Sequence, residues 1–288
     1  MTDGQPRVQR ARLGAELRRL RLLAGLSGRE VARRLGIGHA SVSRIENAQQ
    51  VPSLPEVNAW ADAVGATSET RALLTTLVEA ALNEVETWRS RLRAGLPGMQ
   101  ADVRQLEATA ATLRKVLPTI VPGLLQTAEY ARRVFELVDV LGDSDYAAAV
   151  AERMQRQQIL YDPAHQFEFL ITEAALRWRP GPPRLLAAQL DHIRSASTLD
   201  NVTLGLIPAD AQMRAVPWCG FTLYEDRADD QTPFVAMETA HAGLIVSDPA
   251  DVAIYRKQLE LLRESCVFGD EARDMLTRIA HEQRHAQP

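Results

Sequence analysis

One segment of the sequence has the residue types and spacing of a catalytic metal site. His281 and His285 stand one helical turn apart, with Glu282 between them, in the pattern H-E-x-x-H. In that pattern two imidazoles bind zinc and the carboxylate serves as a general base. The sequence ends three residues after His285, and a terminal helical turn frays rather than supporting an ordered metal shell. We therefore expect a coincidental match and no metal site.

The other common catalytic and cofactor signatures are missing from the sequence. It contains no G-x-G-x-x-G, no G-x-x-x-x-G-K phosphate loop and no G-x-S-x-G nucleophile turn. Cys219 and Cys266 are too few for a disulfide framework or a thiolate metal site. His165, His192 and His241 are isolated from other candidate ligands or bases. We expect no catalytic residues, no cofactor and no enzymatic activity.

Polar residues near residue 40 have a different chemistry, that of base and phosphate recognition. The guanidinium of Arg44 can hold O6 and N7 of a guanine, Ala40 can contact a thymine methyl group, and His39 can donate or accept a hydrogen bond. Small polar side chains and the backbone amides at a helix start are suited to phosphates. The candidate DNA-binding residues are Ser27, Gly28, His39, Ala40, Ser41, Ser43, Arg44 and Asn47. On an isolated helix such residues are ordinary solvated surface. Whether they bind DNA therefore depends on the secondary-structure elements that carry them.

The charge distribution agrees with a nucleic-acid-binding segment. Residues 1–65 contain ten arginines and six acidic residues, a balance of +4, whereas the rest of the chain has 23 basic and 31 acidic residues, a balance of −8. A basic segment attached to an acidic body is typical of a phosphate-binding head on a solvated carrier. No apolar run is long enough for a membrane span and no secretion signal is evident, so we expect a cytoplasmic protein.

The elements around these residues have the pattern of a helix-turn-helix. Helical spacing of leucines predicts a first helix at 8–23, and short helices follow at 29–35 and 39–47. Ser27 and Glu30, three residues apart, form a capping box at the start of the second helix. The Gly36-Ile37-Gly38 turn separates the second and third helices, and a further helix opens after Pro52-Ser53 and closes near Gly65.

The stretch SGREVARRLGIGHASVSRIENAQQVPS, within residues 10–65, resembles the repressor-type helix-turn-helix of the xenobiotic-response-element family. The resemblance implies sequence-specific DNA binding by the helix that starts at His39, and a structural pairing of Arg21 with Glu46. The family usually has Gln where this chain has Gly28, which removes one contact to the DNA backbone. Because one such head makes few contacts, we expect a homodimer on a pseudo-palindromic operator, with double-stranded DNA as its partner.

The remainder of the sequence predicts a helical connector and an α+β domain. Amphipathic spacing predicts a helix from Thr67 or Ser68 to about Leu92, a break at 95–98 and a helix at 102–117. Helices are then predicted at 125–138, 144–160, 184–197, 248–265 and 270–284, and strands at 167–171, 202–207, 221–224, 234–238 and 244–246. The strands at 221–224 and 234–238 are expected to form a hairpin. The expected domains are 1–66, a five-helix helix-turn-helix; 67–104, a connector; and 105–288, α+β with a mostly antiparallel sheet.

Several separated strings in the second half resemble a C-terminal domain of undefined function that is common in WhiJ-like regulators of actinobacteria. They are Val121 to Thr127 with Tyr130-Ala131, Arg153-Met-Gln-Arg-Gln157, Thr172 to Arg177, and Asn201-Val-Thr203 leading to Ile207-Pro208. The resemblance implies a regulatory or partner-binding module and no reaction. Residues near these strings that could line a ligand pocket are Gln126, Tyr130, Glu173, Arg177 and Trp178, although for the Pro122-Gly123 turn core architecture is the preferred interpretation over a binding site.

Three functions are consistent with the sequence. The leading one is a transcriptional regulator, acting as a repressor, whose C-terminal domain senses a small molecule. The second is an antitoxin-like regulator whose C-terminal domain binds a small partner protein. The third is an enzyme tethered to DNA, for which the sequence offers no catalytic constellation.

Overall fold

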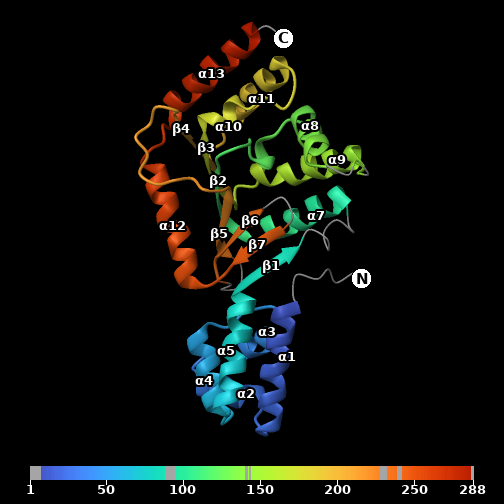
Figure 1. Cartoon of the computed structure of the whole chain (residues 1–288), viewed down its shortest axis with the longest axis vertical. Helices are drawn as coiled ribbons and strands as arrows, with labels where there is room; N and C mark the ends of the chain where they lie inside the picture. Colours follow the sequence, from blue (N-terminus) through green and yellow to red (C-terminus); the bar gives the residue numbers. More distant parts are fainter. Residues whose placement is uncertain are drawn as a thin grey trace. The chain divides into compact units, whose positions relative to one another are not determined.

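The computed structural model describes residues 8–87, 95–139, 142, 144–227, 232–238 and 242–286 (Figure 1). These residues fall into two compact units, the first comprising Met1–Glu86 with Leu244–Asp251 and the second Thr87–Gly243 with Val252–Pro288. The first unit holds the expected helix-turn-helix, and the second holds the mixed α+β domain. Among the described residues, no helix is both long enough and apolar enough to cross a membrane.

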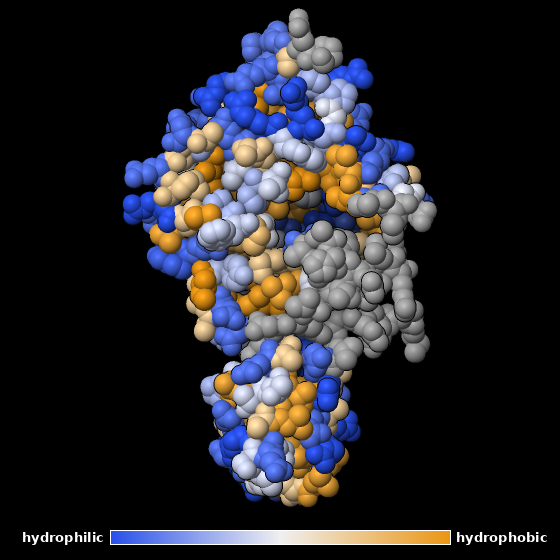
Figure 2. Space-filling view, in the orientation of Figure 1, coloured by the Kyte–Doolittle hydropathy of each residue, from blue (hydrophilic) through white to orange (hydrophobic). Residues whose placement is uncertain are grey.

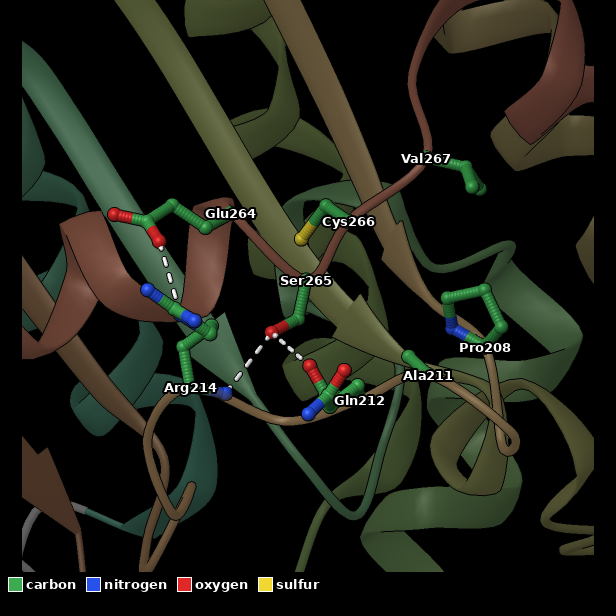
Figure 3. A pocket seen from close by; sticks show the side chains of 8 residues that line it. All are labelled: Pro208, Ala211, Gln212, Arg214, Glu264, Ser265, Cys266 and Val267. Carbon is green, nitrogen blue, oxygen red and sulfur yellow. Dashed lines mark hydrogen bonds and ion pairs between the residues drawn. The ribbon is translucent and has the colours of Figure 1, made fainter.

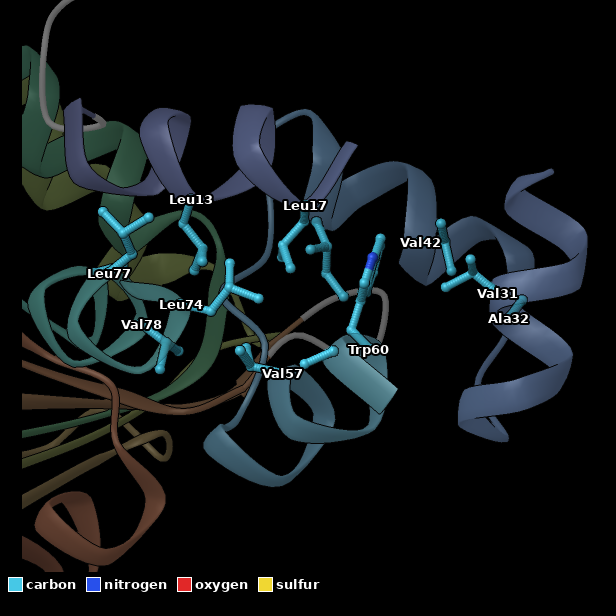
Figure 4. Close-up of a cluster of buried hydrophobic side chains, with 13 residues drawn as sticks. Leu13, Leu17, Val31, Ala32, Val42, Val57, Trp60, Leu74, Leu77 and Val78 are labelled. Atoms are coloured by element: carbon cyan, nitrogen blue, oxygen red, sulfur yellow. The ribbon is translucent and has the colours of Figure 1, made fainter. Parts of the chain in front are cut away.

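The first unit is helical. Its helices are α1 (Val8–Leu23), α2 (Gly28–Leu35), α3 (His39–Glu46), α4 (Leu54–Ala63) and α5 (Ser68–Leu82), followed by the strand β1 (Asn83–Thr87). Trp60 on α4 is fully buried, and leucines and valines of the other helices surround it (Figure 4). The sequence placed α5 in a connector, but Leu74, Leu77 and Val78 of α5 belong to this same core. The helix that follows residue 67 is therefore part of the N-terminal unit.

Local sequence signals explain where these helices begin. Ser27 and Ser53 are the N-cap residues of α2 and α4, and each forms the reciprocal capping box with a glutamate three residues later. α2 ends at Gly36, whose φ of 71° is in the left-handed region that glycine adopts without strain. The expected capping box and glycine turn are both confirmed.

The expected long helix after residue 67 is shorter than predicted. α5 ends at Leu82, whereas the leucine and valine spacing suggested a helix to about Leu92. Residues 83–87 form β1, and residues 88–92 lie outside the described residues. The sequence Asn-Glu-Val-Glu-Thr contains two β-branched residues in alternation with acidic ones, which favours an extended strand over a helix.

The second unit alternates helices and strands. In chain order its helices are α7 (Gly95–Glu107), η1 (Gly123–Leu125), α8 (Ala128–Val138), α9 (Tyr146–Arg156), η2 (Gln157–Tyr161), α10 (Glu173–Arg177), α11 (Pro183–Ala196), α12 (Pro249–Arg263) and α13 (Gly269–His285). Its strands are β2 (Ala110–Leu117), β3 (Gln166–Thr172), β4 (Val202–Ile207), β5 (Phe221–Arg227) and β6 (Phe234–Glu238), and the strand β7 (Ala242–Val246) runs across the boundary after Gly243. Figure 1 draws α7, α8 and α9 together on one side of the strands and α12 on the other.

The sheet is mixed and not purely antiparallel. From β6 to β4 the strand order is β6-β5-β2-β3-β4. β2 runs parallel to β3 and β3 runs parallel to β4, whereas β5 is antiparallel to both β2 and β6. Helical segments connect β2 to β3 and β3 to β4, and such crossovers join parallel neighbours. The hairpin of β5 and β6 is confirmed.

The central strand β2 was not predicted. The sequence favoured one helix over 102–117, but α7 ends at Glu107 and β2 runs from Ala110 to Leu117. The segment Ala-Ala-Thr-Leu-Arg-Lys-Val-Leu is rich in helix-forming residues, so its local preference points to a helix. Pairing with β3 on one side and β5 on the other gives its backbone two ladders of hydrogen bonds, and this tertiary pairing outweighs the local preference.

Candidate functional site

The turn between α2 and α3 is held by backbone hydrogen bonds and by α1. The amide of Ile37 donates to the carbonyl oxygen of Ala32 over 3.0 Å, which closes α2. On the other side of α3, a Cβ added to Gly14 would lie 2.6 Å from the carbonyl oxygen of Ile45. Glycine therefore allows α1 and α3 to approach with their backbones in contact.

A largely buried ion pair holds the end of α3 against α1. Nε of Arg21 donates to Oε1 of Glu46 over 2.5 Å and Nη2 donates to Oε2 over 2.8 Å, while Nη1 donates to the carbonyl oxygen of Leu26. The arginine and glutamate side chains are only 12% and 9% exposed. This hydrogen bond raises the pKa of Arg21. The bidentate geometry confirms the expected pairing. It fixes the orientation of α3 relative to α1.

The start of α3 presents small and polar side chains to solvent. His39, Ala40 and Ser43 are exposed, and they lie on the first turns of a helix whose opposite side buries Val42 and Ile45. In helix-turn-helix proteins the N-terminal residues of the second helix contact base edges in the major groove. The structure therefore places three of the expected base-reading residues on one accessible face.

His39 lies against the start of α2 at the one position that has no side chain. A Cβ added to Gly28 would lie 3.2 Å from Nε2 of His39 and 3.7 Å from Cγ1 of Val42. Glycine at this position therefore leaves room for the imidazole beside α2. The residue that departs from the resembled pattern is the one that accommodates His39.

Arg44 is less available than its position in the sequence suggested. Its Nη2 donates to the hydroxyl of Ser41 over 3.1 Å, and its Nε donates to Oε1 of Gln50 over 3.2 Å. Asn47 is also engaged, because its side-chain amide donates to the carbonyl oxygen of Ser43 over 2.9 Å. A base contact by Arg44 would have to replace these two neutral hydrogen bonds or use its remaining nitrogen.

The start of α2 offers phosphate donors next to one carboxylate. The hydroxyl of Ser27 accepts a hydrogen bond from the amide of Glu30 over 3.2 Å and also lies within hydrogen-bond reach of the Glu30 carboxylate. Glu30 accepts from the amide of Ser27 over 2.7 Å, and this bond lowers the pKa of Glu30. Arg29, beside this cap, is exposed. The sequence interpretation did not include Arg29, although an arginine in the first turn of α2 is a direct signal for phosphate contact.

The five residues expected to line a ligand pocket separate into two groups in the second unit. Gln126 and Tyr130 are buried, and Tyr130 meets Trp178 edge to face with ring centroids 6.4 Å apart. Glu173 accepts a hydrogen bond from Nε of Arg177 over 2.6 Å and another from the amide of Ala209. The first group is mainly core packing, and the second is an ion-paired helix end.

The H-E-x-x-H string lies on α13. The rings of His281 and His285 have centroids 4.3 Å apart, but Glu282 is paired with Nη1 of Arg177 at 2.5 Å. Within the described ranges, no group of three or more histidine, cysteine, aspartate or glutamate residues is placed to hold a metal ion. The glutamate that would act as a base is thus engaged in joining α13 to α10.

An open pocket of the second unit is lined by the segment after β4 and the segment after α12, and its lining includes none of the five expected ligand residues. It has a volume of about 520 Å³, and its lining includes Arg214, Glu264 and Ser265 (Figure 3). Arg214 and Glu264 form an ion pair across 3.2 Å, while the hydroxyl of Ser265 accepts from the amide of Arg214 and donates to the carbonyl oxygen of Gln212. Its polar groups thus bind mainly one another.

A buried polar cluster, which the sequence did not predict, joins α7, β2 and α9. Glu107, with no exposed surface, accepts from Nζ of Lys115 over 2.7 Å through one oxygen and from Nε of Arg156 over 2.8 Å through the other. Burial raises the pKa of Glu107, but the charges of Arg156 and Lys115 outweigh it, so that the pKa is lowered overall. The signal in the sequence was Arg153-x-x-Arg156 at helical spacing, which places both arginines on one face of α9.

Arg153 is the third cation of this cluster, and among the described residues it forms no hydrogen bond to a carboxylate. Its Nε donates to Oε1 of Gln100 over 3.0 Å and its Nη1 donates to Oε1 of Gln126 over 2.5 Å. The guanidinium also lies over the ring of Phe135, 4.3 Å from its centroid. Burial, followed by the charge of Arg156, lowers the pKa of Arg153 to about 9.

Two comparisons with protein families agree with the division of the chain into a helical N-terminal unit and an α+β unit. Residues 12–74 match the model of a helix-turn-helix domain, and residues 100–278 match the model of a domain of unknown function (DUF5753). The first match points to a DNA-binding regulator rather than an enzyme. No curated protein sequence matches the chain.

Among solved structures, the chain is similar to the archaeal chromatin protein TrmBL2, whose structure is described as showing a novel mode of DNA binding. The identity is 12% over 74% of this chain and 67% of that chain, with a TM-score of 0.30, and a likeness of this degree carries no argument about function. The second family model covers more than half of the 288 residues. The chain therefore belongs to the family of proteins that carry this domain of unknown function.

Proposed function

We propose that this protein is a sequence-specific transcriptional regulator that represses by binding an operator as a homodimer in the cytoplasm. The observation that carries the proposal is the exposed first face of α3, with His39, Ala40 and Ser43 accessible on a helix whose direction is fixed by the Arg21–Glu46 pair. The match to a helix-turn-helix domain over residues 12–74 supports the same conclusion.

The residues of this face divide by role. His39, Ala40 and Ser43 are proposed to contact base edges from the exposed N-terminal part of α3, and Arg44 from its last turn. Ser27, Gly28, Ser41 and Asn47 are proposed to position the protein on phosphates, through hydroxyl, amide and backbone donors. Arg29 joins this second set, because its exposed guanidinium stands beside the Ser27 cap.

We infer the homodimer from the small number of DNA contacts that one head can make, and not from an interface in the structure. One small head makes few phosphate and base contacts, and two heads on half-sites about one helical turn of DNA apart multiply them. A dimer bound across a promoter blocks access to it, which makes repression the proposed outcome. The second unit is proposed to sense a small molecule that alters operator binding.

The decisive experiment is selection of bound sequences from a random DNA pool with the full chain at about 0.15 M salt. We expect an enriched, pseudo-palindromic motif. Arg44→Ala and His39→Ala should each lower affinity for that motif by about 1–3 kcal/mol and relax preference at one base pair. Arg12→Ala, which removes an exposed charge from α1, serves as the matched control. No enriched motif would contradict the proposal, and a monomer bound one-to-one to the operator would contradict the dimer.

A second candidate function is an antitoxin-like regulator whose second unit binds a small protein. Exposed apolar side chains in the second unit favour it: Trp218 is 82% exposed and Val216 is 53% exposed. The carbonyl oxygen of Val216 accepts from the side chain of Gln258, so this loop lies along α12, where Ile254 is also exposed. Large exposed apolar groups gathered in one region mark partner surfaces. Trp218→Ser should abolish binding of such a partner and leave operator binding unchanged.

A further inference from the structure

The buried cluster of the second unit contains more positive than negative charge. Lys115 from β2 and Arg153 and Arg156 from α9 are each more than nine-tenths buried. Both oxygens of Glu107 are occupied, one by Lys115 and the other by Arg156. Three cations therefore share one fully buried carboxylate.

Arg153 is the unbalanced member of this cluster. Its hydrogen-bond acceptors are the neutral amides of Gln100 and Gln126. Glu238, exposed at the end of β6, and Glu107 both attract Arg153 electrostatically, but among the described residues no hydrogen bond joins Arg153 to either carboxylate. A buried guanidinium without a hydrogen-bonded anion is costly, because amide dipoles do not replace the hydration that a full charge loses.

A second cluster of charged residues lies on the opposite face of β2. Its arginines are paired with glutamates and remain partly exposed to solvent. Arg114, adjacent to Lys115 in the strand, lies near Glu168 and Glu225, which also pair with Arg263 and Arg256 of α12. The arginines of that cluster are 35–54% exposed, so water shares their charge. The cluster around Arg153 lacks this solvent access, and the described residues supply it with no second buried carboxylate.

The surroundings hold the two guanidinium groups in fixed positions. Gln126 donates through Nε2 to the carbonyl oxygen of Val121, which turns its own carbonyl oxygen towards Arg153. Gln157 donates to the carbonyl oxygens of Gly123 and Gln126. A Cβ added to Gly123 would lie 3.1 Å from Nη2 of Arg156 and 3.4 Å from Cζ of Arg153, so glycine lets the backbone of η1 approach both arginines.

We propose that Lys115, Arg153 and Arg156 form the floor of a binding site for a small molecule that carries an oxyanion group, a carboxylate or a phosphate. Such a group accepts two parallel hydrogen bonds from a guanidinium and supplies the missing negative charge. Figure 2 shows strongly hydrophilic residues at the bottom of a hollow in the second unit, between apolar side chains, in the part where Figure 1 draws α7 and α9. The site rests on the proposed effector-sensing role of the second unit but not on operator recognition.

The test is calorimetric and thermal titration of the full chain with inorganic phosphate, sulfate and citrate, with chloride at equal ionic strength as the control. We expect saturable binding and a rise in Tm for at least one oxyanion. Phosphate and citrate as separate arms distinguish a phosphate from a carboxylate ligand. An equal response to chloride, or no saturable response to any oxyanion, would overturn the proposal.

Arg153→Gln separates a ligand site from a purely structural network. It removes the charge but keeps an amide in the cluster, so anion affinity should fall at least tenfold while the Tm without anion is unchanged or higher. A lower Tm together with unchanged anion affinity would overturn the proposal. Arg153→Lys should retain part of the affinity, and Arg114→Gln, on the other face of β2, should leave it unchanged. Selection of an operator by a protein that fails to bind oxyanions would refute this site alone, whereas oxyanion binding without operator selection would refute the DNA-binding role.

Discussion

The imidazole of His39 lies beside Gly28, so closely that a Cβ on residue 28 would lie 3.2 Å from Nε2. The two residues belong to different helices of the helix-turn-helix, α2 and α3. The absence of a side chain at the start of α2 therefore determines where a proposed base-reading residue of α3 can lie. A side chain at position 28, such as the Gln usual in the resembled family, would require the His39 ring to shift.

We predict that Gly28→Ala alters sequence preference without weakening the fold. The new methyl group must displace the His39 ring, so preference at one base pair of the operator should fall by about 1–3 kcal/mol. Alanine is the better helix former, so Tm should not decrease. Selection of bound DNA by the variant measures the first effect, and thermal unfolding measures the second. An unchanged selected motif would show that His39 does not read that base pair.

The Arg21–Glu46 pair should be the most sensitive ion pair of the first unit. Glu46→Gln leaves a largely buried guanidinium without its anion, and such a loss costs about 3 kcal/mol of unfolding free energy. Denaturant unfolding measures this cost. The control is Glu16→Gln, whose partner Arg19 is 56% exposed and whose loss should therefore have a much smaller effect. Equal costs for the two variants would contradict the structural role assigned to Arg21 and Glu46.

Gly14→Ala should destabilise the first unit although it raises helix propensity. In an exposed helix this change stabilises by roughly 0.5–1 kcal/mol. Here the methyl group would lie 2.6 Å from the carbonyl oxygen of Ile45, and such overpacking costs about 1–3 kcal/mol. Thermal unfolding should therefore show a lower Tm. Ala15→Gly, at the exposed neighbouring position, tests propensity alone and should lower Tm by less; a higher Tm for Gly14→Ala would disprove the close approach of α1 and α3.

The second unit should lose stability in acid through Glu107. Its pKa in the folded protein lies below the ordinary value of 4.5, because Arg156 and Lys115 outweigh the effect of burial. The unfolded chain therefore binds the proton more readily, and this part of the stability is present above about pH 4.5 and is lost as the pH falls through the folded pKa. Glu107→Gln should be less stable at neutral pH and should show a weaker pH dependence. Denaturant unfolding as a function of pH compares the two, and identical slopes would contradict the prediction.

Local signals in the sequence predicted the helix-turn-helix and most elements of the second unit. Capping boxes and a glycine turn act over three to five residues, so they are readable without knowledge of the fold, and β4 and β6 were predicted with the observed bounds. β2 was missed because its strand conformation depends on partners about 54 and 113 residues further along the chain (Thr112 pairs with Gln166 and Glu225). The parallel pairing of β2 and β3 was unpredictable for the same reason.

The candidate sites show the same division. The exposed face of α3 follows from helical periodicity, so His39, Ala40 and Ser43 could be named in advance. The hydrogen bonds that engage Arg44 depend on where Gln50 lies after α3 ends, which periodicity does not specify. The cluster of buried cations forms only where three elements, α7, β2 and α9, come together in the fold. Because β2 was expected to be a helix, its Lys115 could not be paired with Glu107 from the sequence.

The position of β2 also sets an order of events during synthesis of the chain. Its neighbours β3 and β5 leave the ribosome long after it does, and until then residues 110–117 have no strand partner. A segment with strong helix propensity is expected to be transiently helical in that interval and to convert when β3 arrives. α1 to α4, whose contacts are close in sequence, can assemble meanwhile. The newly made protein is therefore expected to acquire its helix-turn-helix before the sheet of its second unit is complete.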